Sequence, residues 1–161
     1  MALRHSWIVY VLSAGKRYNG CMSGTSEDIQ KAWKAALKAR LNAHAPYSRF
    51  KVGAALQLEG VPDAVVGCNV ENASYGGTIC AERVAITQAV ARFGKIRPQF
   101  LVVVTDEIQS TVPCGLCLQA LAEFAGDDLP IHLGNDKGLQ KTLLLRDLLP
   151  QAFRSFQVKT P

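Results

Sequence analysis

Two short motifs in this sequence carry residues that can bind a catalytic metal ion. The first is Cys80-Ala81-Glu82, the second is Pro113-Cys114-Gly115-Leu116-Cys117, and each opens a predicted helix. Thiols at the start of a helix ionise readily, because the helix dipole and the free backbone N–H groups stabilise the thiolate. Zn²⁺ binds thiolates in tetrahedral geometry, so Cys80, Cys114 and Cys117 would leave a fourth position for water. Three protein ligands and one water are typical of a catalytic zinc site.

A carboxylate and a guanidinium follow the first cysteine closely. Zn²⁺ acidifies a bound water, and Glu82, two residues after Cys80, could accept its proton and pass it to a substrate. Three thiolates and one Zn²⁺ leave a net negative charge, which Arg83 could offset by donating a hydrogen bond to a ligating sulfur. Zinc nucleobase deaminases combine a His or Cys two residues before Glu with a later Pro-Cys-x-x-Cys. The two motifs together therefore predict deaminase chemistry.

The cysteines taken alone leave two other interpretations open. Cys114 and Cys117 could form a redox dithiol. A fourth protein ligand, such as Cys68 or His132, would instead make the zinc site structural. The odd total of five cysteines argues against a secreted disulfide scaffold.

Both motifs are expected to lie on elements of a mixed sheet with helices on its faces. A capping signal at 25–28 precedes an amphipathic helix over about 26–42. The remaining predicted elements are strands at 52–58, 64–70, 100–105 and 130–134, buried helices at 80–93 and about 114–124, and a short helix around 145–149.

Composition predicts one folded domain and leaves one question about partners open. The chain has 161 residues, 48% hydrophobic and 19% charged, and no apolar run approaches the roughly 20 residues of a membrane helix. The net charge of +5 arises in residues 1–51, where nine basic residues face two acidic ones. Two functions on nucleic acid therefore remain as alternatives. One is a non-catalytic zinc module that binds through its basic first helix, and the other is a deaminase of cytosine in single strands. The slightly acidic charge of residues 52–161, which contain both motifs, argues against the second alternative, and the first stays open.

Beyond these motifs, the chain resembles the short, homotetrameric cytidine deaminases from about residue 26 to Phe153. Residues 45–55 resemble that family's first loop and strand, and residues 69–75 resemble its nucleoside-binding segment. Residues 78–83 and 113–117 resemble its catalytic and zinc motifs, and residues 148–153 resemble its C-terminal end. One departure is Leu118, where the family usually has arginine, so that a second cation near the sulfurs is absent.

The resemblance implies a fold and an activity. The expected fold is a three-layer α/β/α sandwich with a mixed five-stranded sheet. The expected reaction converts cytidine and 2′-deoxycytidine to uridine and 2′-deoxyuridine with release of ammonia, as in pyrimidine salvage. One Zn²⁺ per subunit would be bound by Cys80, Cys114 and Cys117, with Glu82 as proton shuttle. A cytoplasmic homotetramer acting on a small nucleoside is expected, with neither a membrane nor nucleic acid as partner.

The resemblance also implies substrate contacts on both sides of a subunit boundary. Within one subunit, the contacts would be Phe50 on the pyrimidine, Asn69 and Glu71 on the ribose 3′-hydroxyl, and the Ala81 N–H near the base carbonyl. From the neighbouring subunit, the contacts would be Ala73, Tyr75 and Phe153.

The resemblance divides the chain into a deaminase domain at 25–161 and an N-terminal extension or leader at 1–24. Arg4 and His5 followed by the apolar run at 7–12 have the outline of a signal peptide. The run is short for that purpose, and Lys16 and Arg17 follow at once. Translation starting at Met22 is the alternative explanation of this segment.

Overall fold

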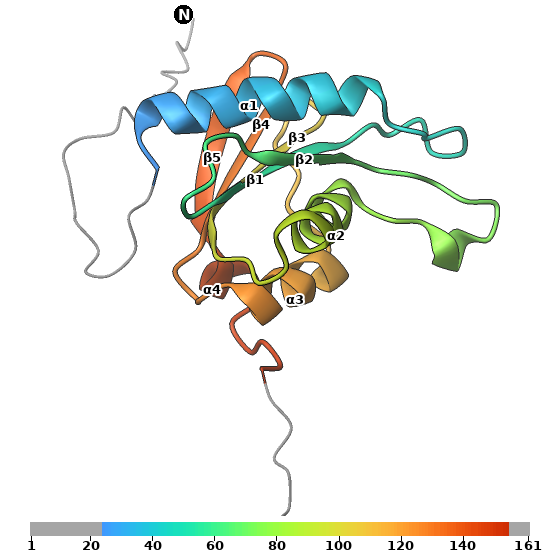
Figure 1. Cartoon of the computed structure of the whole chain (residues 1–161). Coiled ribbons are helices and arrows are strands. Elements are labelled where there is room, and N and C mark those ends of the chain that lie inside the picture. The colour runs from blue at the N-terminus through green and yellow to red at the C-terminus, as the bar shows by residue number, and fades with distance from the viewer. Residues whose placement is uncertain (1–23, 155–161) are drawn as a thin grey trace, which may run out of the picture.

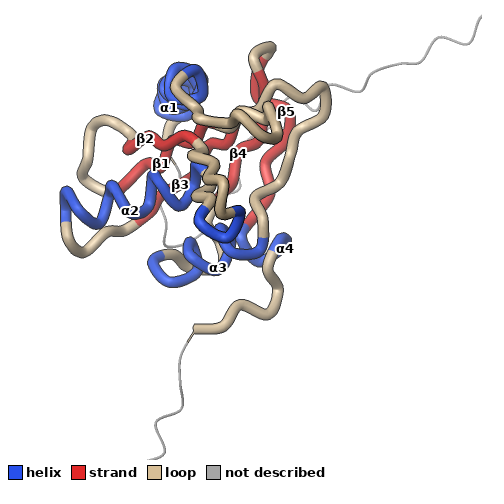
Figure 2. The backbone as a smooth tube through the Cα atoms, turned by 90° about the vertical axis from the view of Figure 1, so that its right-hand side faces the viewer, coloured by secondary structure: helices blue, strands red, loops and turns tan. Residues whose placement is uncertain are grey.

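The computed structural model describes residues 24–154 and arranges them in three layers (Figure 1). Helix α1 (Ser26–Leu41) covers one face of a five-stranded sheet, and α2 (Ala81–Phe93), α3 (Gly115–Phe124) and α4 (Leu145–Leu148) lie on the other face (Figure 2). The strands are β1 (Gly53–Leu58), β2 (Val65–Cys68), β3 (Pro98–Val104), β4 (Pro130–Asn135) and β5 (Gly138–Leu144). The expected three-layer sandwich with a mixed five-stranded sheet is confirmed.

The sheet has the strand order β2-β1-β3-β4-β5. Strands β3 and β4 are parallel, and each of the other neighbouring pairs is antiparallel. The parallel pair requires a crossover, which α3 supplies. Strand β5 was not among the strands predicted from the sequence pattern, because Gln140, Lys141 and Thr142 at its centre are polar and exposed. An edge strand without an apolar face gives no alternating signal.

The central strands carry apolar side chains to both faces, as predicted for the run at 100–105. On β3, Leu101 and Val103 belong to the core beneath α2 and α3. Phe100, Val102 and Val104 belong to the second core, which α1 covers. Side chains alternate between faces along a strand, so a strand buried on both faces is apolar throughout.

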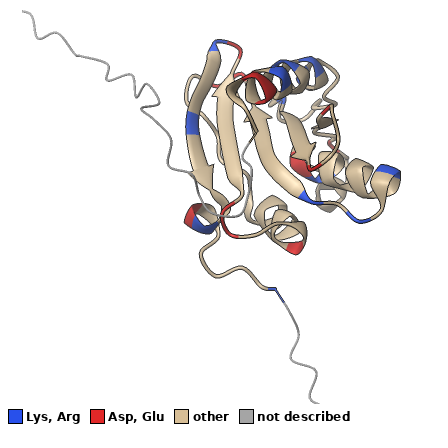
Figure 3. Ribbon diagram, turned by 60° about the vertical axis from the view of Figure 1, so that its left-hand side comes forward, with Lys and Arg blue, Asp and Glu red and all other residues tan. Residues whose placement is uncertain are grey.

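Helix α1 begins at a reciprocal cap, and its lysine side chains lie on its exposed face. The Asp28 N–H donates to the Thr25 hydroxyl at 3.2 Å, and the Thr25 N–H donates to the Asp28 carboxylate at 3.0 Å. Lys31, Lys34 and Lys38 are exposed, and the basic positions of the helix are blue in Figure 3. Across the described residues 24–154, however, fourteen basic residues face thirteen acidic ones. The net charge of this range is therefore +1, and most of the chain's net charge of +5 comes from residues outside it.

Two helices begin at the cysteine motifs, and the sheet places both starts at one end of the molecule. Cys80 is the N-cap of α2 and Cys114 is the N-cap of α3. Strand β2 leads through residues 69–79 to Cys80, and β3 leads through residues 105–113 to Cys114. None of the helices in the described range is long and apolar enough to span a bilayer.

A glycine on β2 allows α2 to approach the sheet closely. A Cβ atom at Gly67 would lie 2.3 Å from the Ala81 carbonyl oxygen and 2.6 Å from the Ala85 nitrogen. Both atoms are backbone atoms, so they cannot move aside as a flexible side chain would. The absence of a side chain at residue 67 therefore sets how near the first turn of α2 lies to β2.

We expect Gly67→Ala to lower the free energy of unfolding by about 1–3 kcal/mol, because the added methyl group overpacks this contact. Chemical denaturation of the full chain measures the change. Gly126→Ala is the matched control, because a Cβ atom there meets nothing within 4 Å. Equal stability of the two variants would contradict the close approach.

Candidate active site

The three cysteines predicted to bind a metal ion meet in one cluster. The Cys80 and Cys114 sulfurs are 3.9 Å apart, the Cys114 and Cys117 sulfurs are 3.5 Å apart, and all three lie within 4.8 Å of one another. Zinc bound tetrahedrally at about 2.3 Å from each sulfur requires sulfur–sulfur separations of about 3.8 Å. Cys117 is buried and Cys114 is exposed, so the cluster opens to one side. The donor set and its spacing fit one zinc ion with an accessible fourth position.

The residues proposed as a fourth, structural ligand are not part of this cluster. The metal-binding group found in the described residues consists of Cys80, Cys114 and Cys117, without Cys68 or His132. His132 instead lies edge-on against Phe100, and its Nδ1 is 2.8 Å from the Thr142 hydroxyl. Within the described residues, the cysteine cluster therefore lacks the fourth protein ligand that a structural zinc site has.

The electrostatics of the cluster favour a bound cation. A hydrogen bond with the Cys117 thiol, aided by Arg83 and by the Cys114 thiol, lowers the pKa of Cys80 to about 5. The same contact with Cys80, together with burial, raises the pKa of Cys117. One thiolate therefore forms readily, but further ionisation is opposed by the charge already present. A divalent cation among the three sulfurs removes this opposition.

Arg83 lies beside the sulfurs, as its predicted role requires. Its Nη2 donates to the Thr78 carbonyl at 2.9 Å, which holds the guanidinium near the start of α2. The pKa of Cys80 is lowered in part by this guanidinium. Its buried Nε has no hydrogen-bond partner within the described part of the chain. The guanidinium interacts with Cys80 and Cys117, so a cation lies beside the cluster that would carry negative charge.

Glu82 lies in the first turn of α2 and is 4% exposed. Burial raises the pKa of its carboxyl group, and the neighbouring Cys80 adds to the effect. A hydrogen bond with Cys117 acts in the opposite direction and places the carboxyl group against the sulfur cluster. A carboxyl group with a raised pKa is a better proton acceptor than an ordinary glutamate and can still return the proton, as proton transfer in catalysis requires.

The residues predicted to hold the ribose and the base meet at the loop before β1. The Asn69 amide donates to the Phe50 carbonyl and accepts from the Val52 N–H, both at 2.8 Å. The Glu71 carboxylate accepts from the Tyr47 N–H at 2.8 Å. Asn69 and Glu71 therefore hold the loop that carries Phe50, a role that the sequence patterns did not reveal.

Ser48 joins these groups and was not singled out from the sequence. Its hydroxyl contacts the Glu71 carboxylate and accepts a hydrogen bond from the Phe50 N–H at 3.0 Å. The next residue, Arg49, has a positive φ of 61°, so the loop turns sharply just before Phe50. A serine directly before a turn residue is a weak signal on its own.

The residues predicted to serve a neighbouring subunit are all exposed. Residues 71–78 extend away from the body of the molecule as an arm that contains the 3₁₀ turn η1 (Tyr75–Gly77) (Figure 1). Two hydrogen bonds between Val70 and Ile79 close the base of the arm and lead the chain to Cys80. Tyr75 is 76% exposed and Phe153 is 54% exposed. Ala73 lies exposed on the same arm, whereas Ala81 is buried at the first position of α2.

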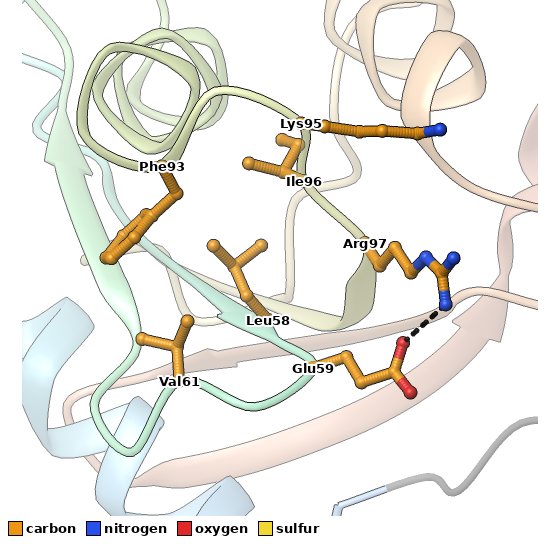
Figure 4. Close-up of a pocket in the computed structure, with 7 residues that line it drawn as sticks. All are labelled: Leu58, Glu59, Val61, Phe93, Lys95, Ile96 and Arg97. Atoms are coloured by element: carbon orange, nitrogen blue, oxygen red, sulfur yellow. Dashed lines mark hydrogen bonds and ion pairs between the residues drawn. The ribbon is translucent and has the colours of Figure 1, made fainter.

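A surface hollow at the far end of α2 lacks groups for the predicted chemistry (Figure 4). It holds about 270 Å³ above Leu58, Phe93 and Ile96, and the ion pair of Glu59 with Arg97 spans 3.5 Å at its rim. A second hollow of about 330 Å³ shares Leu58 with it. Thirteen helical residues, about 20 Å, separate the two ends of α2. The cysteine cluster is therefore the candidate site.

Comparison with known proteins gives consistent matches. A family model described as the cytidine and deoxycytidylate deaminase zinc-binding region matches residues 26–133. The chain is 42% identical over 126 residues to a cytidine deaminase of Halalkalibacterium halodurans, covering 78% of this chain and 94% of that relative. It is 42% identical over 118 residues to a cytidine deaminase of Mycobacterium tuberculosis, covering 73% and 84%. The crystal structure of a cytidine deaminase from Burkholderia pseudomallei superposes with a TM-score of 0.70 at 41% identity, covering 77% of this chain and 98% of that one.

We expect Cys114→Ser to abolish zinc retention, because a neutral hydroxyl replaces one of three thiolates. Elemental analysis of the purified protein measures zinc per chain, with about one ion expected for the parent chain. Cys68→Ser is the matched control, since Cys68 is a half-buried free cysteine outside the cluster. Retention of one zinc by Cys114→Ser, or its loss from Cys68→Ser, would refute this ligand set.

Proposed function

Because this chain belongs to the cytidine and deoxycytidylate deaminase family, we propose that it hydrolyses cytidine and 2′-deoxycytidine to uridine and 2′-deoxyuridine with release of ammonia. The observation that carries the proposal is the cluster of Cys80, Cys114 and Cys117 beside the buried Glu82. This arrangement combines a metal site with an open position and a carboxyl group that can transfer protons. Relatives covered over most of their length are named cytidine deaminases, which supports a nucleoside as the substrate.

Cys80, Cys114 and Cys117 would hold the zinc ion through their sulfurs. Zinc in such a site acts as a Lewis acid and lowers the pKa of a bound water. Arg83 lies beside Cys80 and would limit the negative charge that three thiolates bring. Leu118 is buried and packed in the core beneath α2 and α3, so the arginine usual at this position has no counterpart here.

Glu82 would move two protons during the reaction. It accepts a proton from the water that adds to C4 of cytosine and donates it to N3. It then transfers the second proton of that water to the amino group at C4, which leaves as ammonia. The raised pKa of the buried carboxyl group suits it to both directions of transfer.

The substrate would lie between the cysteine cluster and the loop that carries Phe50. Phe50 would pack on the pyrimidine, and the Ala81 N–H would bind near the base carbonyl. The Asn69 amide would donate a hydrogen bond to the ribose 3′-hydroxyl, and the Glu71 carboxylate would accept one from it. Their amide and carboxylate already bond the loop backbone, and each retains further lone pairs or N–H groups for the sugar. One set of side chains would thus hold both the loop and the sugar.

The assembly that supports this site would be a homotetramer. Tyr75 and Phe153 are large, exposed side chains, and with Ala73 they would complete the pocket of a neighbouring copy. Leu116, 68% exposed on the first turn of α3, would be covered in the same assembly. The site needs reduced thiols, which supports a cytoplasmic location. The near balance of charge in residues 24–154 gives no support to the nucleic-acid alternatives.

We expect Glu82→Gln to retain zinc but to lower kcat for cytidine at least about 100-fold, because the amide cannot transfer the proton. The loss of cytidine absorbance and the release of ammonia are measured on the same sample. Glu123→Gln, an exposed position on α3, is the matched control. Near-normal turnover by Glu82→Gln would overturn its role, and an inactive parent chain with one zinc would overturn the proposed reaction.

We expect subunits that are inactive for different reasons to complement each other. In solution the protein should have four times the 17.4 kDa subunit mass by light scattering. Tyr75→Ala should lower activity, because the ring reaches a neighbour's pocket. Co-expression with Glu82→Gln should restore it in part, since an intact Glu82 then meets an intact Tyr75. Co-expression of Glu82→Gln with Cys114→Ser is the control, in which both changes are expected to damage a subunit's own site. No recovery in the first pair would refute the shared pocket.

A further inference from the structure

The segment that follows α4 is fastened to α3 through the main chain of Phe153. The Gln119 Nε2 donates to the Phe153 carbonyl at 2.6 Å, and the Phe153 N–H donates to the Gln119 Oε1 at 3.1 Å. One side-chain amide therefore pairs with both backbone groups of a single residue. Two such bonds fix the position of the Phe153 main chain along α3 and its orientation on the surface of that helix.

Arg154 provides a second attachment next to the first. Its Nη1 donates to the carbonyls of Ala122 at 2.7 Å and Ala125 at 2.9 Å, and its Nη2 pairs with the Asp127 carboxylate. These carbonyls belong to the C-terminal end of α3, where helices leave acceptors unsatisfied and favour a cation. Two consecutive residues of the segment are thus tied to the same helix.

Phe153 nevertheless remains 54% exposed. A large aromatic side chain on a fixed main chain is suited to insertion into another surface, because little freedom remains to be lost on contact. Gln119 lies two residues after Cys117 on α3. The same helix therefore carries two of the cluster sulfurs at its start and the attachment for Phe153 in its middle.

We propose that Gln119 is a positioning residue that presents Phe153 to the nucleoside site of a neighbouring subunit. The inference rests on the proposed function, which places Phe153 at a substrate. Gln119 acts through the main chain of Phe153. Without the two hydrogen bonds, Phe153 occupies its binding position for a smaller fraction of the time. The apparent affinity for the nucleoside falls in proportion to this occupied fraction.

The test compares variants that remove one or both hydrogen bonds at nearly constant side-chain size. Gln119→Met removes both, and we expect KM for cytidine to rise at least about fivefold, with kcat within about twofold of the parent and with zinc content and tetramer unchanged. Gln119→Glu keeps the acceptor for the Phe153 N–H but loses the donor, and we expect a smaller rise. Gln88→Ala, an exposed glutamine on α2, is the control and should keep the parent KM.

A double-mutant cycle with Phe153→Ala separates positioning from a general structural effect. In the Phe153→Ala background, Gln119→Met should change KM less than about twofold, because no ring remains to be placed. An equal rise in both backgrounds, an unchanged KM in Gln119→Met, or loss of zinc from either Gln119 variant would overturn the proposal. An active parent chain with unaffected Gln119 variants refutes this inference alone, whereas a zinc-loaded parent without cytidine turnover refutes the proposed function as well.

Discussion

Two helix N-termini meet at one end of the sheet and hold three sulfur atoms within 4.8 Å of one another. The ionisation of Cys80 opposes that of Cys117, as the lowered pKa of Cys80 and the raised pKa of Cys117 indicate, and a bound cation would relieve this opposition. The rest of the site follows from this requirement. Arg83 supplies positive charge beside the cluster, and the exposure of Cys114 leaves one side open to solvent and substrate.

The sheet brings the two helix starts together by different routes. The parallel pair of β3 and β4 requires a crossover, and α3 begins its return at the carboxyl end of β3. Helix α2 follows the arm at 71–78, and its first turn lies close to β2 because residue 67 has no side chain. The position of Cys80 at the start of α2 thus depends on the backbone packing of α2 against β2. Helix α1 lies on the opposite face and covers the second core.

Polar side chains hold the irregular segments around the site. These segments lack the regular hydrogen bonds of a sheet, so their backbone groups need other partners. Glu71 and Asn69 supply partners to the loop before β1, and Gln119 and Arg154 supply them to the segment after α4. In both places, hydrogen bonds from a charged or amide side chain position the backbone of a segment that carries an aromatic residue. The aromatic residues, Phe50 and Phe153, are the ones proposed to meet the nucleoside.

The sequence by itself determined the chemistry, because metal binding and proton transfer depend on a few residue types at short spacings. Cys80, Glu82 and the Pro-Cys-x-x-Cys motif indicated a catalytic zinc site, and apolar periodicity located four strands and the four helices. Strand β5 escaped the pattern because its exposed centre is polar, and it was expected only through the family resemblance. The tertiary structure alone decided the contacts between distant segments. These include the convergence of Cys80 with Cys114, the bonding of Ser48 to Glu71 and the pairing of Gln119 with Phe153. Such contacts join residues more than twenty positions apart, and no local pattern encodes a partner at that distance.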